Sequence, residues 1–318
     1  MHSKIELIKR NVAEIVTEPE LKELLEKKKN PVVYCGYEPS GPLHLGHLVT
    51  ITKLQDLERA GFKIKILVAD VHAFLNRKGN EEEIGKEVAM WKKTLKEICP
   101  NAQIFLGSDF QFNRNYLADV FRLAQKLTVS RGLRSMQEIA RNIDQATISQ
   151  LIYPLMQVVD IKYLAADIAL GGLEQRKVHM VGREMQKVLN HSFIAFHVPL
   201  IGSLRDPEEK MSKSVPGSYV SVFDSYEEIK KKIQNAYCPE KVSEKNPVLQ
   251  IARLIIFPRI KKFKVERAKK FGGHVEFFDY FELERAYVSG NLHPFDLKNA
   301  VAEYLEKIIK PIREKFKR

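Results

Sequence analysis

The feature that most constrains the fold is a strand, a loop, a helix and a second strand within residues 31–70. Residues 31–37 (PVVYCGY) are β-branched and aromatic, and a turn rich in proline and glycine follows them. Apolar residues then recur at helical spacing until Gly61, and 63–70 is a second β-branched run. Two strands joined by a helix form a βαβ unit, which predicts a parallel sheet.

The same alternation continues along the first half of the chain. Helical periodicity at 81–98 and an apolar run at 102–107 add a helix and a strand. We therefore expect an α/β fold with a Rossmann-like, doubly wound parallel sheet. Residues 4–29 predict two short helices broken near Pro19. Residues 110–150 are helical in pattern and predict an insertion that serves subunit contact or a partner.

Strand signals fade after about residue 224. The helical patterns that follow predict a smaller C-terminal α-helical domain. We expect a catalytic domain over 1–222 and a helical domain over 223–318. The first would contain the insertion at about 110–150 and a mobile loop at 202–218, which is rich in Gly, Ser, Pro and charge. The predicted C-terminal helices are 227–236, 248–257, 280–288 and 294–316.

Composition narrows the class of partner. A net charge of +12 over 318 residues favours a polyanion such as nucleic acid, although a generally basic surface explains the charge equally well. Cys35, Cys99 and Cys238 lie far apart, which argues against a zinc knuckle or a disulfide framework and fits a reducing compartment. No apolar leader or membrane-spanning run occurs, so we expect a cytoplasmic chain without a membrane partner.

A histidine pair marks the first candidate site. His44 and His47 lie where the first strand turns into the first helix, at the strand end where α/β sheets bind ligands. Helix N-termini favour phosphate, and Gly46 lets a nucleotide approach the backbone. Two imidazoles three residues apart can donate hydrogen bonds to phosphate oxygens. A metal pair without an evident third ligand and plain helix capping are the alternatives.

A second motif, KMSKS, lies on the predicted loop. A lysine on a mobile loop can be brought to a polyphosphate only when the nucleotide is bound. A solvated basic loop would explain this motif better if it stood alone, but its order and placement after the histidine pair make the combination specific. Its residues are Lys210, Met211, Ser212, Lys213 and Ser214.

A third group of polar residues lies on one stripe of an apolar helix. Tyr153, Gln157 and Asp160 fall at i, i+4 and i+7, and Pro154 is acceptable in the first turn. Such a stripe is usually a solvent face, but the apolar neighbours predict a buried helix. A buried carboxylate needs a partner, which a ligand can supply. Asp160 paired with the hydroxyl of Tyr34 would suit a phenolic OH.

The last candidate is a basic run at 259–270, followed by Phe-Gly-Gly. Basic residues interleaved with aromatics suit phosphate contact and base stacking in RNA. A solvated helix face or a linker explains this run equally well.

Together these motifs resemble those of the class I aminoacyl-tRNA synthetases. HLGH at 44–47 is similar to the family's HIGH signature, and 210–214 matches its KMSKS signature letter for letter. The resemblance implies that ATP activates an amino acid, which is then transferred to tRNA, with Mg²⁺ carried in by ATP and no tightly bound protein-liganded metal. It implies that Lys213 contacts the triphosphate while both histidines support the α-phosphate. The catalytic residues would be His44, His47, Lys210 and Lys213, and the ATP site would add Gly46, Met211, Ser212 and Ser214.

Residues 34–41 and 153–175 further resemble tyrosyl-tRNA synthetases of the archaeal and eukaryotic type. This resemblance covers nearly the whole chain. It implies that Tyr34 and Asp160 bind the hydroxyl of L-tyrosine, and that Tyr153, Gln157 and Gln175 surround its α-amino group. The resemblance also implies that Gly36 and Glu38 line the pocket by main chain, with Asp70 and His72 near the substrate end of the second strand.

The resemblance also implies an anticodon site for tRNA(Tyr) and a homodimer. Phe271 would stack on an anticodon base, and His293 and Asp296 would read it. Three alternatives stay open. A tryptophan-specific relative shares both signatures, although an indole offers only one N–H donor. A nucleotidylyltransferase outside translation would not need the helical domain, and a non-catalytic RNA-binding protein would explain only the charge.

Overall fold

Two compact units make up the chain in a computed structural model, which describes residues 3–138, 145–209, 211, 215 and 217–316. The sheet unit consists of Met1–Gly41 and Lys53–Pro199, and the helical unit of Pro42–Thr52 and Leu200–Arg318. The helical unit thus takes in a short early segment as well as the C-terminal part of the chain. The expected domain boundary between residues 222 and 223 stays a prediction.

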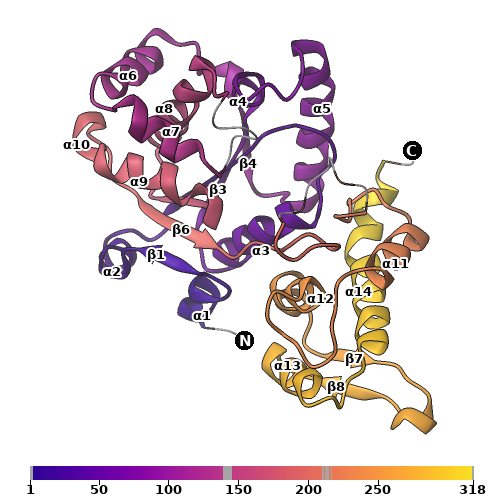
Figure 1. Cartoon of the computed structure of the whole chain (residues 1–318). Helices are drawn as coiled ribbons and strands as arrows, with labels where there is room; N and C mark the ends of the chain where they lie inside the picture. Colours follow the sequence, from indigo (N-terminus) through magenta and orange to yellow (C-terminus); the bar gives the residue numbers. More distant parts are fainter. Residues whose placement is uncertain (1–2, 139–144, 210, 212–214, 216, 317–318) are drawn as a thin grey trace. The chain divides into compact units, whose positions relative to one another are not determined.

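The sheet unit is built on a six-stranded sheet with the order β1-β6-β5-β2-β3-β4 (Figure 1). All neighbouring pairs are parallel except β1 with β6, in which Glu14 lies opposite His197. This arrangement confirms the predicted α/β class. The strands are β1 (Glu14–Val16), β2 (Val32–Tyr37), β3 (Lys63–Val68), β4 (Gln103–Leu106), β5 (Ile168–Gly172) and β6 (Ile194–Val198).

The central strands form because they can be buried on both faces. Every residue of β5 and β6 is buried, as are five of the six residues of β2. Strands covered on both sides by helices read as continuous apolar runs. The exception in β2 is Gly36, near the carboxyl end of the strand, which is exposed.

Helices cover the strands on either side of this centre. α5 packs against β3 and β4, α9 packs against β5 and β6, and α6 to α10 lie together beside the sheet (Figure 1). The helices that begin in this unit are α1 (Lys4–Lys9), α2 (Glu18–Lys27), α4 (Asp70–Leu75), α5 (Glu81–Ile98), α6 (Arg114–Ala124), α7 (Val129–Met136), α8 (Ile148–Tyr163), α9 (Arg176–Glu184) and α10 (Gln186–Leu189), and α3 (Leu45–Arg59) enters it at Lys53.

The N-terminal segment differs in one respect from the prediction. Pro19 does not break a helix but lies in the first turn of α2, behind a capping box formed by Thr17 and Glu20. Proline is tolerated there because the first helical N–H groups have no partner within the helix. The residues between α1 and α2 instead form β1, which is too short to show a strand pattern in the sequence.

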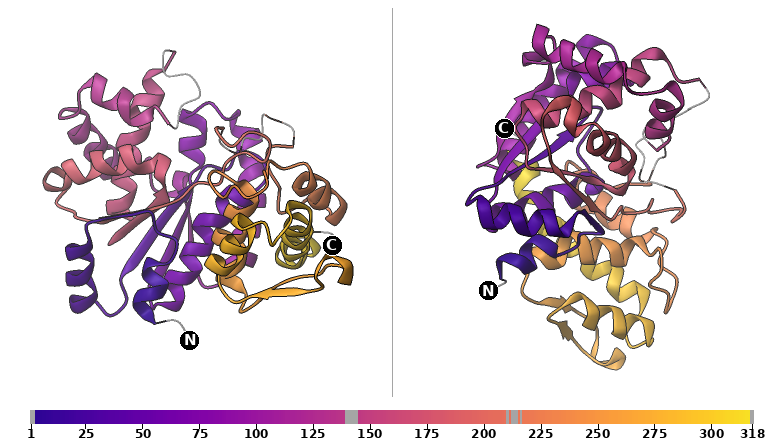
Figure 2. Two further views of the ribbon diagram at one scale, coloured as in Figure 1. Left: turned by 60° about the horizontal axis from the view of Figure 1, so that its bottom comes forward. Right: turned by 90° about the vertical axis from the view of Figure 1, so that its left-hand side faces the viewer.

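The helical unit contains α11 (Tyr226–Gln234), α12 (Pro247–Ile251), α13 (Tyr280–Val288) and α14 (Pro294–Glu314). A π-helical turn (Ala252–Ile256) and a 3-10 turn (Phe257–Arg259) extend α12, so all four predicted helices are present. The unit also holds an unpredicted antiparallel hairpin of β7 (Phe263–Val265) and β8 (Val275–Phe277), which contacts α14 and α13 (Figure 2). This hairpin is an addition to the predicted helical domain, which is otherwise present.

The basic run at 259–270 supplies β7. Phe263 and Val265 are buried while Lys264 between them is half-buried, so a strand of three residues lies inside the run. Three residues are too few to reveal a period of two in sequence. None of the described helices combines the length and the apolar character of a membrane-spanning segment.

Candidate active site

Asp160 is fully buried on α8 and defines the centre of the site. Its Oδ1 accepts hydrogen bonds from Nε2 of Gln111 at 2.8 Å and from the hydroxyl of Tyr116 at 2.7 Å. Its Oδ2 has no hydrogen-bond partner among the described residues and lies 3.5 Å from Nε2 of His72. Burial raises the pKa of Asp160 to about 7, although both hydrogen bonds lower it. One carboxylate oxygen is thus held by the protein, and the other is left for a further donor.

Gln111 and Tyr116 are site residues that sequence reasoning missed. Both belong to the segment expected to be a contact insertion, and both are fully buried. Gln111 follows the 3-10 turn (Gly107–Asp109) that ends β4, and Tyr116 lies in the first turns of α6. The position of Gln111 just beyond the carboxyl end of a parallel strand was the available signal, because ligands bind at that edge.

His72 is buried beside this carboxylate as a neutral ring. Its Nδ1 lies 3.3 Å from Nε2 of Gln111, and burial lowers its pKa to about 3. Its ring packs edge-on against Tyr153, with 4.6 Å between ring centroids. At neutral pH the pocket therefore presents an imidazole without charge.

Tyr34 reaches the same region from β2. Its ring is buried, and burial followed by the nearby charge of Asp160 raises the pKa of its hydroxyl well above the ordinary value. The hydroxyl therefore stays a hydrogen-bond donor. A β-carbon added at Gly36 would lie 2.7 Å from this hydroxyl oxygen, so only glycine leaves the space open. Tyr34, Gly36 and Asp160 therefore lie close together, and their role in binding tyrosine stays a prediction.

Gln157 and Gln175 form a second polar group of the site. Nε2 of Gln157 donates to Oε1 of Gln175 at 3.0 Å, while Oε1 of Gln157 is buried and has no hydrogen-bond partner within the residues that the structure describes. Gln175 lies in the 3-10 turn (Leu173–Gln175) after β5. Its Cβ and Cγ lie 2.8 Å from the point where a β-carbon of Gly171 would stand. Glycine at the end of β5 therefore allows Gln175 to fold back over the sheet.

Tyr153 and Glu38 are joined directly. The hydroxyl of Tyr153 donates to Oε1 of Glu38 at 2.7 Å, and Nδ2 of Asn76 donates to the same carboxylate at 3.1 Å. Burial, then the charge of Glu38, raises the pKa of Tyr153 well above the ordinary value. The side chain of Glu38 is thus fixed by two donors, although sequence reasoning expected its main chain to line the pocket.

Asp70 occupies the start of α4, directly after β3. Its Oδ1 accepts a hydrogen bond from the backbone N–H of Ser108 at 3.0 Å. This bond ties the carboxyl ends of β3 and β4 together. Asp70 is half-buried and lies just after the carboxyl end of β3, and its place beside a substrate stays a prediction.

In the helical unit, the histidine pair lies at the start of α3. Nδ1 of His47 accepts from the backbone N–H of His44 at 3.1 Å, and Nδ1 of His44 accepts from that of Gly46 at 3.1 Å. The two ring centroids are 3.9 Å apart. Because each Nδ1 accepts, each neutral ring carries its proton on Nε2. Both protons on Nε2 are of the kind that could donate to a phosphate oxygen.

Most of the KMSKS motif falls outside the described residues, namely Lys210, Ser212, Lys213 and Ser214. Met211 is described and is half-buried. The ends of the loop are anchored within the helical unit. The backbone N–H of Gly202 donates to Gln250 at 3.0 Å, and that of Leu204 donates to the carbonyl of Ser218 at 2.9 Å.

The three anticodon candidates lie in the C-terminal part of this unit. His293 caps α14, because its Nδ1 accepts from the backbone N–H of Phe295 at 3.1 Å, and its Nε2 lies 3.2 Å from Glu240. Asp296 lies in the first turn of the same helix. Phe271 ends a 3-10 turn (Lys269–Phe271), but its side chain is outside the described part of the chain.

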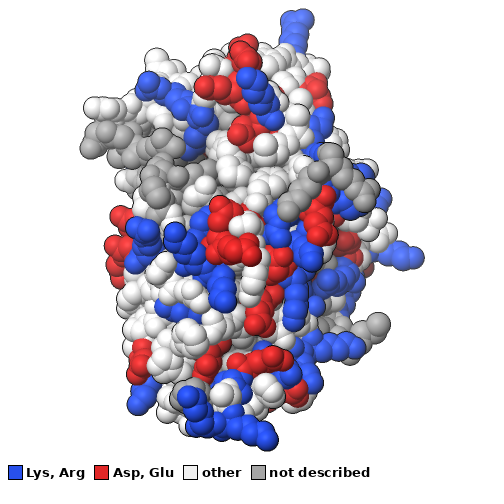
Figure 3. All heavy atoms as spheres, turned by 90° about the vertical axis from the view of Figure 1, so that its right-hand side faces the viewer, with Lys and Arg blue, Asp and Glu red and all other residues white. Residues whose placement is uncertain are grey.

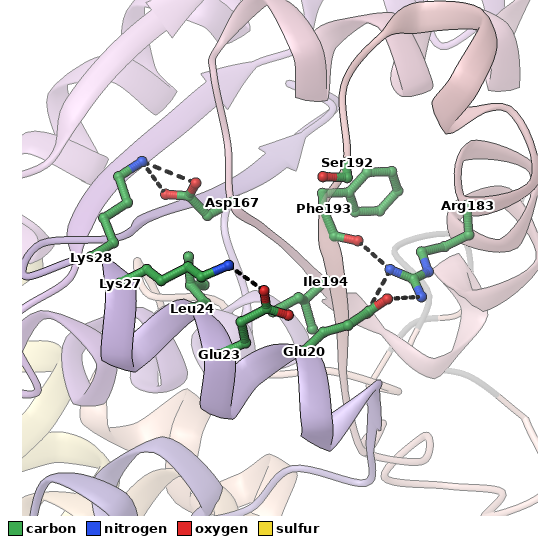
Figure 4. A pocket seen from close by; sticks show the side chains of 10 residues that line it. All are labelled: Glu20, Glu23, Leu24, Lys27, Lys28, Asp167, Arg183, Ser192, Phe193 and Ile194. Atoms are coloured by element: carbon green, nitrogen blue, oxygen red, sulfur yellow. Dashed lines mark hydrogen bonds and ion pairs between the residues drawn. The ribbon is translucent and has the colours of Figure 1, made fainter.

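Among the described residues, no group of three or more His, Cys, Asp or Glu side chains could hold a metal ion. A surface cavity of roughly 480 Å³ in the sheet unit has ion pairs along its walls (Figure 4). Arg183 bonds to Glu20 at 2.9 Å, and Lys28 bonds to Asp167 at 2.7 Å. These pairs fasten α2 to α9 and to the start of β5.

Comparison with known proteins agrees with this geometry. A family profile described as class I tRNA synthetases (W and Y) matches residues 26–310. A tyrosine–tRNA ligase of Archaeoglobus fulgidus is 46% identical over 317 residues, covering 98% of this chain and 97% of that protein. A tyrosine–tRNA ligase of Methanosarcina barkeri is 45% identical over 315 residues, covering 98% of each chain.

Solved structures agree as well. The crystal structure of tyrosyl-tRNA synthetase from Archaeoglobus fulgidus with L-tyrosine matches with a TM-score of 0.94 and covers 98% of both chains. That of Pyrococcus horikoshii, also with L-tyrosine, matches at 34% identity with a TM-score of 0.92, covering 99% of this chain and 95% of that one. The chain belongs to the class I tRNA synthetases of the tryptophan and tyrosine family, in which its relatives are archaeal tyrosine–tRNA ligases.

Proposed function

We propose that this chain activates L-tyrosine with ATP to tyrosyl-adenylate and transfers tyrosine to the 3′ end of tRNA(Tyr). One observation carries the choice of amino acid. A single helix, α8, buries two acceptor atoms that have no partner in the described part of the chain, Oδ2 of Asp160 and Oε1 of Gln157. Buried polar atoms need partners. Tyrosine carries two matching donors, a phenolic hydroxyl and an ammonium group.

The phenol would donate to Asp160 and accept from Tyr34. Gln111 and Tyr116 hold the other carboxylate oxygen, so the free oxygen has a fixed direction. Phenylalanine would leave the buried carboxylate oxygen unpaired, which costs binding energy. Tryptophan fits this group less well, because its single N–H cannot accept the hydrogen bond that Tyr34 offers.

The ammonium group would donate to Gln157 and Gln175. The side-chain N–H group of Gln157 already donates to Gln175, so its oxygen would accept a hydrogen bond from the ammonium group. The hydroxyl of Tyr153 donates to Glu38, so its oxygen is available as another acceptor. Three neutral oxygen atoms around an ammonium group select for charge without needing a buried salt bridge.

Activation needs positioning and charge stabilisation. The tyrosine carboxylate attacks the α-phosphate of ATP, and pyrophosphate leaves. His44 and His47 would donate their Nε2–H groups to phosphate oxygens as negative charge develops. Lys213 and Lys210 would bring positive charge to the leaving polyphosphate, and Mg²⁺ carried with ATP would neutralise part of it.

The second step transfers the tyrosyl group to tRNA. A ribose hydroxyl at the 3′ end attacks the carbonyl of the adenylate, and AMP leaves. Phe271, His293 and Asp296 are proposed to bind the anticodon. The exposed ring of Phe295, beside Asp296, adds an aromatic surface to this group. Acidic and basic side chains are interspersed on the face drawn in Figure 3, so binding of tRNA would depend on local groups more than on the net charge of the chain.

We also propose a cytoplasmic homodimer, with the insertion as its contact surface. Large apolar side chains of the insertion and its edges are exposed, including Phe112, Phe121, Val129 and Ile148, which are 66, 63, 65 and 77% exposed. Exposed apolar groups of this kind mark protein contact sites. Sedimentation of the full chain tests the proposal, since a monomer at micromolar concentration would contradict it.

Pyrophosphate exchange tests the central proposal. ATP–pyrophosphate exchange should depend on L-tyrosine and should be absent with tryptophan and with the other standard amino acids. Exchange that responds to tryptophan would favour the tryptophan-specific alternative, and no tyrosyl-adenylate at all would favour a non-catalytic RNA-binding protein.

Lys213→Ala tests the catalytic assignment. Because Lys213 is assigned to the phosphates, the variant should lower the single-turnover rate of adenylate formation far more than it weakens tyrosine binding. An unchanged rate would remove Lys213 from the mechanism.

A further inference from the structure

Two buried histidines beside the pocket have no role in the mechanism so far. His179 on α9 is 1% exposed, and His197 on β6 is fully buried. Nδ1 of His179 lies 3.0 Å from Nε2 of His197, and the rings are stacked with centroids 5.1 Å apart. Burial lowers the pKa of His179 to about 3, and burial also lowers the pKa of His197 despite its bond to Glu14. Both rings are therefore neutral under ordinary conditions.

In the hydrogen bonds of this pair, His179 donates to His197 and His197 donates to Glu14. Nδ1 of His197 lies 2.9 Å from Oε2 of Glu14, whose carboxylate is held by Nε and Nη2 of Arg176 at 2.8 and 2.9 Å. The pKa of Glu14 is lowered, chiefly by its hydrogen bond to Arg176, so the carboxylate only accepts. His197 must then carry its proton on Nδ1 and accept at Nε2. It follows that His179 donates from its own Nδ1.

His179, at the buried end of this series of hydrogen bonds, packs beside the same glycine as Gln175. Cε1 of His179 lies 3.2 Å from the point where a β-carbon of Gly171 would stand, and Cβ and Cγ of Gln175 lie 2.8 Å from the same point. Both side chains therefore fill one space above the end of β5. At the outer end, Arg176 directly follows Gln175 in sequence. The hydrogen-bonded series from His179 to Arg176 thus packs beside the same glycine as Gln175 and also ends at the residue that follows Gln175.

The surrounding structure holds this chain in place. Glu14 lies opposite His197 in the pairing of β1 with β6, so the strand register sets their separation. The helix after β1 is fastened by the bond between Arg183 and Glu20, drawn in Figure 4. Arg183 and His179 lie on the same helix, α9, so α9 is bonded to the β1–α2 segment at both of its ends.

We propose that His179, His197 and Glu14 form a hydrogen-bonded chain that positions Gln175 to bind the α-amino group of tyrosine. The inference rests on the proposed function. These residues are positioning residues, because they act through Gln175 and not by touching the substrate.

Binding of two ligands by the full chain tests this role. L-Tyrosine has the ammonium group, and 3-(4-hydroxyphenyl)propanoate lacks it but keeps the phenol and the carboxylate. His179→Ala should weaken tyrosine binding about tenfold, the effect of disturbing one hydrogen bond to a charged group. The affinity for the propanoate should stay within about twofold of that of the unmodified protein, because Gln175 makes no bond to it. Calorimetric titration measures both.

Conservative variants separate positioning from general damage. Asparagine places an amide N–H where the imidazole has Nδ1, so His179→Asn should recover most of the tyrosine affinity. Glutamine places its amide further out, so His179→Gln should not. Glu14→Ala, at the partly exposed end of the chain, should give a smaller loss that again spares the propanoate. His191→Ala is the matched control, since this ring bonds only the carbonyl of Ala166 among the described contacts and should leave both affinities unchanged.

The outcomes distinguish the possible failures. Equal losses for both ligands in His179→Ala and Glu14→Ala, or equal behaviour of the asparagine and glutamine variants, would overturn the positioning role. If His179→Ala does not fold, His179→Asn and Glu14→Ala still decide the question. If the unmodified protein forms no tyrosyl-adenylate, the proposed function fails and this inference fails with it.

Discussion

Replacing Asp160 with asparagine should stabilise the chain without substrate, and more so as the pH rises. An ordinary aspartate loses its proton near pH 3.8, whereas Asp160 keeps its proton up to about 7 because it is buried. Between these values the folded chain holds more protons than the unfolded chain, so the free energy of unfolding falls as the pH rises. From about pH 5 to about pH 8 the loss is on the order of 2 to 3 kcal/mol.

Asp160→Asn removes this loss while keeping the shape of the side chain. Its oxygen can still accept from Gln111 and Tyr116, and the variant no longer places a charge at this buried position. Denaturant unfolding without tyrosine should be measured at both pH values. Relative to the unmodified chain, the free energy of unfolding of the variant should rise by that amount between the lower and the higher pH. A difference that does not change with pH would refute the reasoning. Asp167→Asn is the control, because it breaks the ion pair with Lys28 and should give no gain at high pH.

Two further variants test the geometry of the pocket. Tyr116→Phe removes the 2.7 Å hydrogen bond to Asp160 and should raise the KM for tyrosine about tenfold in pyrophosphate exchange, leaving the KM for ATP unchanged; equal changes in both would point to general damage. Gly36→Ala would bring a methyl group within 2.7 Å of the Tyr34 hydroxyl and should raise the tyrosine KM by a similar factor, whereas an unchanged KM would show that the space above Tyr34 is not used.

The parallel sheet and the main pocket residues could be predicted because their signals are local. The run of β-branched residues in β2, the turn after it and the periodicity of α3 all lie within 31–70, and the polar stripe on α8 is a pattern within one helix. Asp160 could therefore be recognised as a buried carboxylate before its surroundings were known. Such signals depend only on spacing along the chain.

The partners of Asp160 could not be predicted in the same way. Gln111 and Tyr116 lie more than forty residues before it, and nothing in their own segment distinguishes them from an ordinary amphipathic insertion. The pairing depends on how the segment after β4 packs on α8, which is a tertiary contact. The short strands β1 and β7 could not be predicted for another reason, since three residues give no measurable periodicity.

The two unpaired acceptors on α8 also lie at a fixed distance from each other along the helix. Gln157 and Asp160 are three residues apart, so a rigid rise of roughly 4.5 Å along the helix axis, set by the backbone, fixes the offset between their side chains. An amino acid with one methylene more or less between ring and amine would donate to one acceptor and leave the other without a hydrogen bond. Selection by length would therefore accompany selection by the hydroxyl group, and enlarging the pocket alone would not remove it.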